Sequence, residues 1–129
     1  MRCLFDSNPL IYFLNGVLPS HGREWIREGI RFGGAYSVIT RIEILGFPES
    51  PERTQAASRL LQRFTEIALS EVILQRTIHL RRQYRRLKIP DAIIAATAME
   101  SALPLITHNL DDFTGIAGLI VKDPFHAPP

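Results

Sequence analysis

The 129-residue sequence has a single cysteine, Cys3, which excludes an internal disulfide framework and a zinc site built on cysteine ligands. Its four histidines are dispersed, and no two have the spacing of a zinc-binding pair. No stretch approaches the ~20 consecutive apolar residues of a transmembrane helix, and the N-terminus lacks the basic and apolar regions of a secretion signal. We therefore expect a cytoplasmic protein that does not associate with membranes.

Several motifs for cofactors and nucleophiles are also missing. There is no GxGxxG or GxxxxGK[ST] to bind a nucleotide cofactor, and no GxSxG to mark a serine nucleophile. Lysine is scarce, since only Lys88 and Lys122 occur among the fifteen basic residues. Arginine makes bidentate contacts to phosphate, but an arginine-rich surface can equally be a composition bias. The net charge of +2 gives only a mild attraction to polyanions.

Apolar residues make up 46% of the chain and charged residues 22%, which suits one compact domain. We assign residues 1–125 to this domain and 126–129 to a flexible C-terminal tail. Short apolar runs alternate with helical patterns, and this alternation predicts an α/β fold whose parallel sheet has helices on both faces. Strands are expected at 2–8, 35–39, 67–70, 104–109 and 118–125, and helices at 8–16, 20–34, 41–47, 50–67, 71–88 and 90–103.

Four acids adjoin these apolar elements. Asp6 ends the first strand, Glu43 lies in the helix after the second, Asp91 opens the helix at 90–103, and Asp112 follows the fourth strand. Ligands of open α/β sheets bind outside the carboxyl ends of the strands, so the four acids can converge on one edge. Each acid also has a purely structural interpretation. Asp6 could form a turn or cap a helix N-terminus, and Glu43 could form a capping box with Thr40. Asp91 could be stabilised by the dipole of its helix, and Asp112 could cap a turn.

Acids that converge repel one another, which raises some of their pKa values unless a cation neutralises them. A site made only of oxygen ligands suits hard cations such as Mg²⁺ or Mn²⁺. An ion held in this way orients a phosphodiester, lowers the pKa of an attacking water and stabilises the leaving oxygen. The pattern of acids therefore indicates metal-dependent phosphodiester hydrolysis.

At these residues the sequence resembles the PIN-domain ribonucleases, specifically the VapC-type toxins of toxin–antitoxin pairs. The resemblance covers essentially the whole chain. "LFDSNPLIYFL" matches the first motif with Asp6, "SVITRIEILGFP" the second with Glu43, and "IPDAIIAATAMESALPLIT" the third with Asp91. In "THNLDDF", the residues on the pattern Thr-x-Asn-x-x-Asp-Phe are Thr107, Asn109, Asp112 and Phe113.

The resemblance implies a three-layer α/β/α sandwich with a central, mainly parallel sheet. It also implies an endoribonuclease that uses Mg²⁺, or Mn²⁺, to cut single-stranded RNA, that forms a homodimer and that has a cognate antitoxin. Asp111 is an alternative to Asp112 as the fourth acid. The implied metal-binding and catalytic residues are Asp6, Glu43, Asp91 and Asp112. The implied supporting or substrate-positioning residues are Ser7, Asn8, Thr107 and Asn109, although Ser7 and Thr107 can equally be turn residues.

Basic and apolar surfaces indicate where partners could bind. In a helix over 71–88, two pairs of arginines at i,i+4 spacing share sides: Arg81 with Arg85, and Arg82 with Arg86. They could be a solvated face near a helix C-terminus, or could contact RNA phosphates or an acidic antitoxin segment. The helices at 8–16 and 20–34 are expected to form an apolar groove for an antitoxin.

Two other functions compete with this one. A haloacid-dehalogenase-type phosphatase also has an aspartate after its first strand, but it needs a second aspartate two residues later, where this chain has Asn8. The other alternative is a catalytically silent PIN-like module that binds RNA or a partner. All four acids are present, so the sequence favours the hydrolase.

Overall fold

A five-stranded parallel sheet forms the centre of the computed structural model, which describes residues 2–126. The strand order is β3-β2-β1-β4-β5, and every neighbouring pair is parallel. The predicted α/β class and parallel sheet are therefore confirmed. The strands are β1 (Leu4–Phe5), β2 (Ala35–Ser37), β3 (Thr65–Ile67), β4 (Leu105–Ile106) and β5 (Val121–Lys122).

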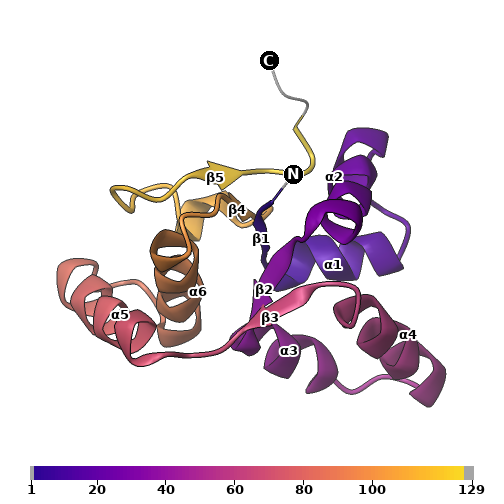
Figure 1. Cartoon of the computed structure of the whole chain (residues 1–129), viewed down its shortest axis with the longest axis horizontal. Helices are drawn as coiled ribbons and strands as arrows, with labels where there is room; N and C mark the ends of the chain where they lie inside the picture. The colour runs from indigo at the N-terminus through magenta and orange to yellow at the C-terminus, as the bar shows by residue number, and fades with distance from the viewer. Residues whose placement is uncertain (1, 127–129) are drawn as a thin grey trace.

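Within residues 2–126, six α-helices cover the two faces of this sheet (Figure 1). The helices α5 and α6 lie on one face, and α1 to α4 lie on the other, which gives the predicted three layers. The helices are α1 (Ser7–Leu14), α2 (Ser20–Phe32), α3 (Val38–Leu45), α4 (Pro51–Leu61), α5 (Glu71–Gln83) and α6 (Ile89–Glu100), and a short 3₁₀ helix, η1 (Leu110–Asp112), follows β4.

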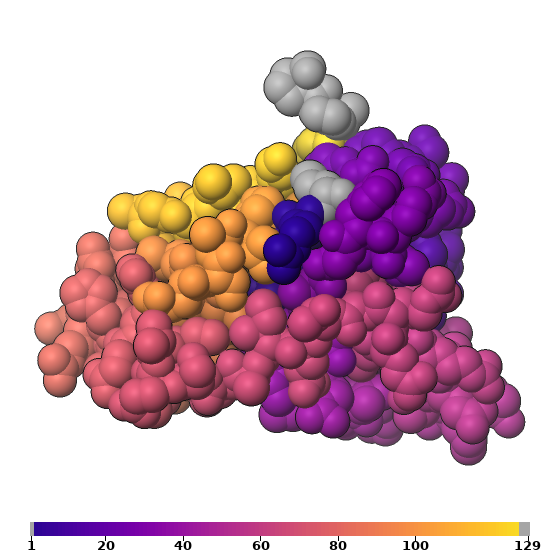
Figure 2. Space-filling model, viewed as in Figure 1, coloured from indigo at the N-terminus to yellow at the C-terminus, as the bar shows by residue number. Residues whose placement is uncertain are grey.

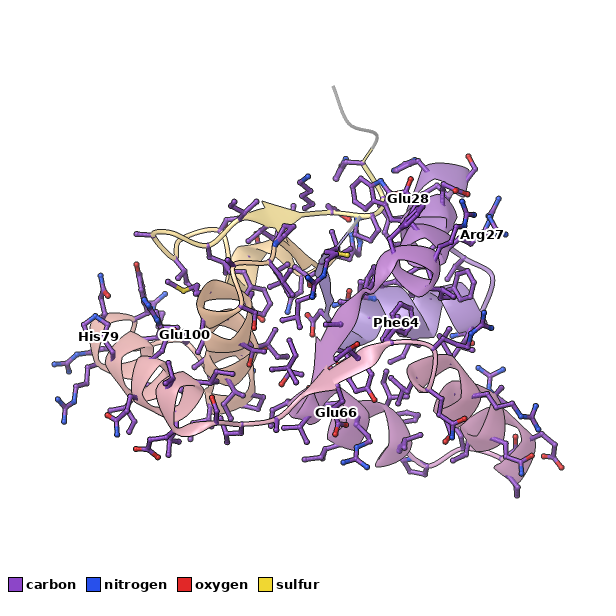
Figure 3. The ribbon with its side chains drawn as sticks, in the orientation of Figure 1. Arg27, Glu28, Phe64, Glu66, His79 and Glu100 are labelled. Carbon is purple, nitrogen blue, oxygen red and sulfur yellow. The ribbon has the colours of Figure 1, made fainter. Side chains whose placement is uncertain are left out.

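The alternation of side chains along the strands creates two hydrophobic cores. Leu4 points into the core beneath α5 and α6, whereas its neighbour Phe5 points into the core beneath α1 to α4. Leu105 and Ile106 divide between the two cores in the same way. On the second face, the ring of Phe64, which Figure 3 labels beside the sheet, meets the ring of Phe5 edge to face. The two ring centroids are 5.3 Å apart.

Several element boundaries differ from the sequence prediction, and the helix predicted over 50–67 ends at Leu61 as α4. The third strand is Thr65–Ile67, because these residues pair with β2, while Ser70 is already the N-cap of α5. The helix α5 ends at Gln83, so the predicted helix over 71–88 is five residues too long. The helix α3 begins at Val38 with Ser37 as its N-cap, which makes the predicted capping box of Thr40 and Glu43 wrong.

The C-terminal segment runs along the outer edge of the molecule towards α2, as the yellow surface in Figure 2 shows. Of the predicted tail at 126–129, residues 127–129 lie outside the described residues. His126 is described, and its Nε2 lies 3.2 Å from a carboxylate oxygen of Asp123. Among residues 2–126, no helix has both the length and the apolar composition needed to cross a bilayer.

Candidate active site

The first acid, Asp6, lies at the carboxyl end of the central strand β1 and is 6% exposed. Its Oδ1 accepts a hydrogen bond from the backbone N–H of Ser7 at 2.8 Å, so the predicted N-cap role is present. Its Oδ2 accepts one from the hydroxyl of Thr107 at 2.9 Å. Because each carboxylate oxygen has two lone pairs, both oxygens retain capacity for a further ligand.

The buried residue Thr107 connects the ends of β1 and β4. While its hydroxyl donates to Asp6, the same oxygen accepts from the backbone N–H of Asn109 at 3.0 Å and from the side-chain amide of Asn8 at 3.4 Å. The carbonyl oxygen of the Asn8 side chain accepts from the backbone N–H of His108 at 3.0 Å. Asn8, Thr107 and Asn109 therefore form one polar network around Asp6.

The second acid, Glu43, lies on α3 and meets Asp6 through a shared neighbour. The hydroxyl of Ser7 donates to Glu43 Oε1 at 2.6 Å, while the backbone N–H of Ser7 binds Asp6. The N-cap of α3 is Ser37, whose hydroxyl oxygen accepts from the backbone N–H of Ile39 at 3.2 Å. Glu43 therefore does not cap α3, and its carboxylate binds Ser7 at the end of β1.

The third and fourth acids, Asp91 and Asp112, come from the first turn of α6 and from η1. Burial is the main cause that raises the pKa of Asp91 to about 7, followed by repulsion from Asp112 and Asp6, a hydrogen bond with Asp112 and repulsion from Glu43. Burial also raises the pKa of Asp6, against hydrogen bonds from Ser7 and Thr107, and repulsion from Glu43 and Asp112 adds to the rise. The four predicted acids therefore lie close enough to perturb one another.

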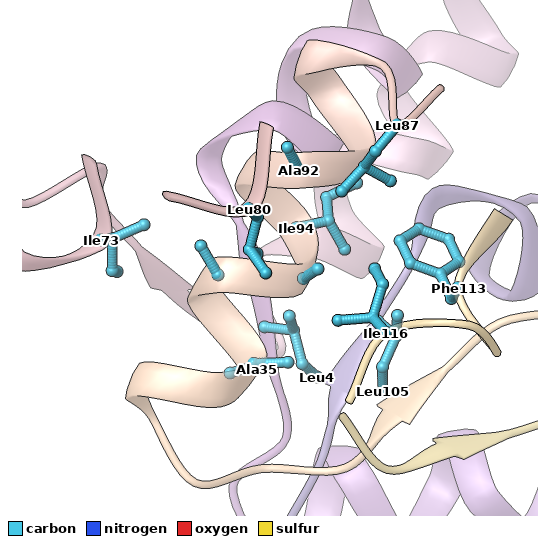
Figure 4. Close-up of a cluster of buried hydrophobic side chains, with 13 residues drawn as sticks. Leu4, Ala35, Ile73, Leu80, Leu87, Ala92, Ile94, Leu105, Phe113 and Ile116 are labelled. Atoms are coloured by element: carbon cyan, nitrogen blue, oxygen red, sulfur yellow. The ribbon is translucent and has the colours of Figure 1, made fainter. Parts of the chain in front are cut away.

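Hydrophobic burial fixes the two segments that carry this acid pair. Ala92 follows Asp91 and Phe113 follows Asp112, and both apolar neighbours are fully buried in the same core (Figure 4). The side-chain amide of Asn109 donates to Asp112 Oδ2 at 2.5 Å and so orients the fourth acid. It is Asp112, and not Asp111, that interacts with Asp91 and Asp6.

The donor set of this cluster fits a hard divalent cation. This fit concerns the type of ligand and not its present geometry. Within residues 2–126, no three His, Cys, Asp or Glu side chains are arranged to hold a metal ion, and Asp91 shares a hydrogen bond with Asp112. A shared proton is how two crowded carboxylates reduce their repulsion without a cation. A divalent ion bound by carboxylate oxygens would remove the same repulsion more fully. Asp6, Glu43, Asp91 and Asp112 are the residues that would hold it.

Comparison with known proteins agrees with the fold. The family model of the PIN domain matches residues 3–119. The chain belongs to the PIN-domain family. Ribonuclease VapC10 of Mycobacterium tuberculosis is 35% identical to it over 130 residues, which cover 97% of this chain and 94% of the relative. The predicted resemblance to VapC-type PIN domains is confirmed.

Two solved structures share the architecture. In a toxin–antitoxin complex from Klebsiella pneumoniae, one chain is 35% identical, with a TM-score of 0.78 over 97% of this chain and 99% of that chain. A chain of the DNA-bound VapBC complex from Salmonella typhimurium has a TM-score of 0.83 at 23% identity, over 96% of this chain and 98% of that chain. The second similarity concerns the fold alone.

A cavity of about 440 Å³ opens beside the acids of this PIN domain. Asp91 and Asp112 contribute to its lining, together with Asp111. The cations in the lining are Arg85, Arg86 and Lys88, from the connection between α5 and α6.

The four arginines predicted to contact RNA or an antitoxin do not share helix faces in the way the sequence suggested. Because α5 ends at Gln83, Arg85 and Arg86 lie in the connection that follows it. Arg81 donates to the backbone carbonyl of Leu87 at 2.5 Å and so closes this connection. Arg81, Arg82 and Arg85 line a separate groove beside α5 and α6.

A second polar cluster of the PIN domain, around Asp123, was missed by the sequence analysis. The buried Asp123 lies just after β5, and its Oδ1 and Oδ2 are 3.0 and 3.1 Å from Nδ1 of His108. It also accepts from the backbone N–H of Phe125 at 2.9 Å. An acid at the end of a predicted strand was the signal that identified Asp6, and Asp123 has a similar position, with one residue between it and the apolar run that ends at Val121.

Proposed function

We propose that this PIN domain is an endoribonuclease that uses Mg²⁺ or Mn²⁺ to hydrolyse phosphodiester bonds of single-stranded RNA. The observation that carries the proposal is the convergence of four acids, from the end of β1, α3, α6 and η1. Burial, and then repulsion within this cluster, raise the pKa of Asp91 to about 7. The relative named ribonuclease VapC10 supports the same activity. We infer further that the protein acts in the cytoplasm as the toxin of a type II toxin–antitoxin pair.

Each acid in the proposed mechanism is held by a named neighbour. Ser7 fixes Asp6 through its N–H and Glu43 through its hydroxyl, while Asn109 fixes Asp112. When bound, the divalent ion orients the scissile phosphate, lowers the pKa of the attacking water and stabilises the leaving oxygen. Release of the proton shared with Asp112 leaves Asp91 anionic and able to serve as a ligand.

The cations beside the acids suit the backbone of an RNA substrate. Arg85, Arg86 and Lys88 line the same cavity as Asp91 and Asp112, so a strand whose scissile phosphate lies at the acids passes these side chains. Lys and Arg contacts to phosphate contribute affinity without sequence preference. The basic cavity lining therefore serves to bind RNA, and the acids serve to cut it.

We assign the cognate antitoxin to an apolar groove of about 350 Å³ between α1, α3 and α4. Ile11, Leu14 and Phe47 line the groove and are 37%, 36% and 64% exposed. It differs from the predicted groove, which was placed between α1 and α2. The K. pneumoniae relative occurs in a toxin–antitoxin complex, which supports an antitoxin as the occupant.

We assign the homodimer contact to the opposite side of the molecule. Leu74, Ile78 and Ile89 are 38%, 42% and 56% exposed and line the groove of about 760 Å³ beside α5 and α6. A second copy would remove this apolar surface from water, which is the main favourable contribution to most protein association. Sedimentation of Ile78→Asp against wild type tests this contact, and an unchanged dimer would place the contact elsewhere.

The test of the activity uses purified protein and single-stranded RNA. Wild type should cut the RNA with Mg²⁺ or Mn²⁺ and lose that activity in EDTA, while Asp91→Asn should fold and not cut. Far-UV circular dichroism confirms the fold of the variant. Cleavage at the wild-type rate by Asp91→Asn would overturn the mechanism, and RNA binding without any cleavage by wild type would favour the silent PIN-like module.

A further inference from the structure

The cavity beside the acids combines two means of binding phosphate. Asp91 and Asp112 are proposed to hold the ion that contacts the scissile phosphate, whereas Arg85 and Arg86 are cations that can contact a phosphate directly. Single-stranded RNA carries one phosphate per nucleotide. Where the ion and the arginines contact neighbouring phosphates of one strand, one nucleoside lies between them in this cavity.

The size and the uncharged part of the lining suit a single nucleoside. The volume of about 440 Å³ lies within the range of ~300–1,000 Å³ that is typical of small-molecule sites. Leu87 and Ile116 are buried and contribute apolar lining, and the half-buried Tyr84 contributes an aromatic ring. Aromatic side chains bind unpaired bases by stacking, which tolerates different base identities.

The ring of Tyr84 is held in place by the chain on the far side of η1. Its hydroxyl oxygen accepts a hydrogen bond from the backbone N–H of Ala117 at 2.9 Å. This bond ties the segment after α5 to the segment after η1, and both segments line the cavity. The aromatic wall is therefore fixed before a ligand arrives, which lowers the entropic cost of binding.

We propose that this cavity is a subsite for one unpaired nucleotide of the RNA, the one next to the cleaved bond. Its base lies against Tyr84 and Ile116, and its phosphate contacts Arg85 and Arg86. The proposal rests on the proposed ribonuclease function and adds to it, because it assigns a nucleoside contact to residues outside the acid cluster. A paired base cannot enter, so the subsite restricts cleavage to single strands.

Gly115 offers a way to fill the subsite without disturbing the fold. It lines the cavity, and a Cβ added there would meet no heavy atom within 4 Å. The positive φ angles among the described glycines are at Gly16, Gly33 and Gly118, so a side chain at position 115 causes no backbone strain. Gly115→Leu should occupy the space of the base, and Gly115→Ala is the matched control.

The experiment measures cleavage and nucleotide binding separately. For oligoribonucleotide cleavage, Gly115→Leu should raise KM about tenfold, the loss of roughly one stacked base, while kcat and Mn²⁺ affinity stay unchanged. Gly115→Ala should resemble wild type. An abasic nucleotide beside the cleaved bond should raise the KM of wild type by a similar factor. It should raise the KM of Gly115→Leu only slightly further, because the variant and the abasic substrate remove the same contact.

Binding is followed by NMR of the full chain with AMP, GMP, CMP, UMP and inorganic phosphate as probes. The nucleotides should shift the signals of Tyr84 and Ile116, and phosphate alone should not. Equal shifts from phosphate, or an unchanged KM in Gly115→Leu, would overturn the subsite while leaving the ribonuclease function intact. Nucleotide shifts that Gly115→Leu abolishes, in a protein that cuts no RNA, would support the subsite and refute the function.

Discussion

The carboxyl groups of Asp91 and Asp112 share a hydrogen bond, although one lies in the first turn of α6 and the other in η1. A hydrogen bond between two carboxyl groups requires a proton on one of them. Burial, followed by repulsion from Asp112 and Asp6, raises the pKa of Asp91 to about 7, so the pair retains a proton up to near-neutral pH. The pair therefore stores repulsion that either a proton or a divalent cation can relieve.

The first prediction concerns stability as a function of pH. The pKa of Asp91 rises from 3.8 to about 7 on folding, so the folded protein binds a proton more tightly than the unfolded chain. The contribution of Asp91 to stability is therefore present below pH 3.8 and is lost as the pH rises to about 7. In EDTA at pH 8, Asp91→Asn should raise Tm by about 3 °C, and at pH 4 it should not. Mg²⁺ should raise the Tm of wild type at pH 8. An equal gain in Tm from Asp91→Asn at pH 8 and pH 4 would contradict the view that ionised Asp91 destabilises the folded protein.

The adjacent acids Asp111 and Asp112 give a matched pair of variants. Both residues line the cavity beside the acids, and Asp112 also interacts with Asp91 and Asp6. Asp112→Asn should lower kcat by about 100-fold or more, the scale of losing a group that holds or orients a catalytic metal. Asp111→Asn should stay within about threefold of wild type. The reverse order in an RNA-cleavage assay would assign the fourth acid to Asp111.

The sequence identified the acids because each adjoins an apolar strand or helix, and burial of these elements brings the acids to one edge of the sheet. It could not show where α5 ends. Tyr84 and Leu87 continue the apolar period of Leu80 and reach the same core, although Tyr84 is already extended at φ −119° and ψ 90°. Burial thus continues beyond the helix, and neither glycine nor proline marks its end. The sequence also placed Ser37 inside the second strand, whereas the strand β2 ends there and Ser37 is the N-cap of α3.

A further prediction tests the polar network around Asp6. Thr107→Val keeps the size of the side chain but removes the hydroxyl that binds Asp6 and accepts from Asn109. We expect a loss of about 1–3 kcal/mol in the free energy of unfolding, together with a roughly 10–100-fold loss of Mn²⁺ affinity by calorimetry. Thr97→Val is the control, because Thr97 is equally buried but its hydroxyl donates to the carbonyl of Ile93 within α6. Equal loss of Mn²⁺ affinity in both variants would show that the network does not position the site.

The basic lining of the cavity can be tested through the salt dependence of RNA binding. Arg86→Ala should weaken binding and reduce the slope of log affinity against log salt concentration by about 0.7, the value for one phosphate contact on a single strand. Arg59→Ala on α4 is the control, since Arg59 bonds to Gln55 on the other face of the sheet. A slope that falls equally in both variants would indicate general attraction and no specific contact at Arg86.

The proposed antitoxin groove gives the last prediction. Phe47 is 64% exposed in the groove between α1, α3 and α4, and Phe32 is 56% exposed at the end of α2, outside that groove. Phe47→Asp should weaken binding of the antitoxin, taken as the small protein encoded beside this chain, by about 30-fold or more, the scale of an aromatic interface anchor. Phe32→Asp should bind normally, and both variants should cut RNA like wild type, because neither residue lines the acid cavity. Calorimetry with the purified partner measures the difference. If Phe32→Asp lost antitoxin binding and Phe47→Asp did not, the antitoxin site would be assigned to the α2 surface instead. The reason is that an aspartate on a docking face places an unpaired carboxylate against apolar side chains of the partner.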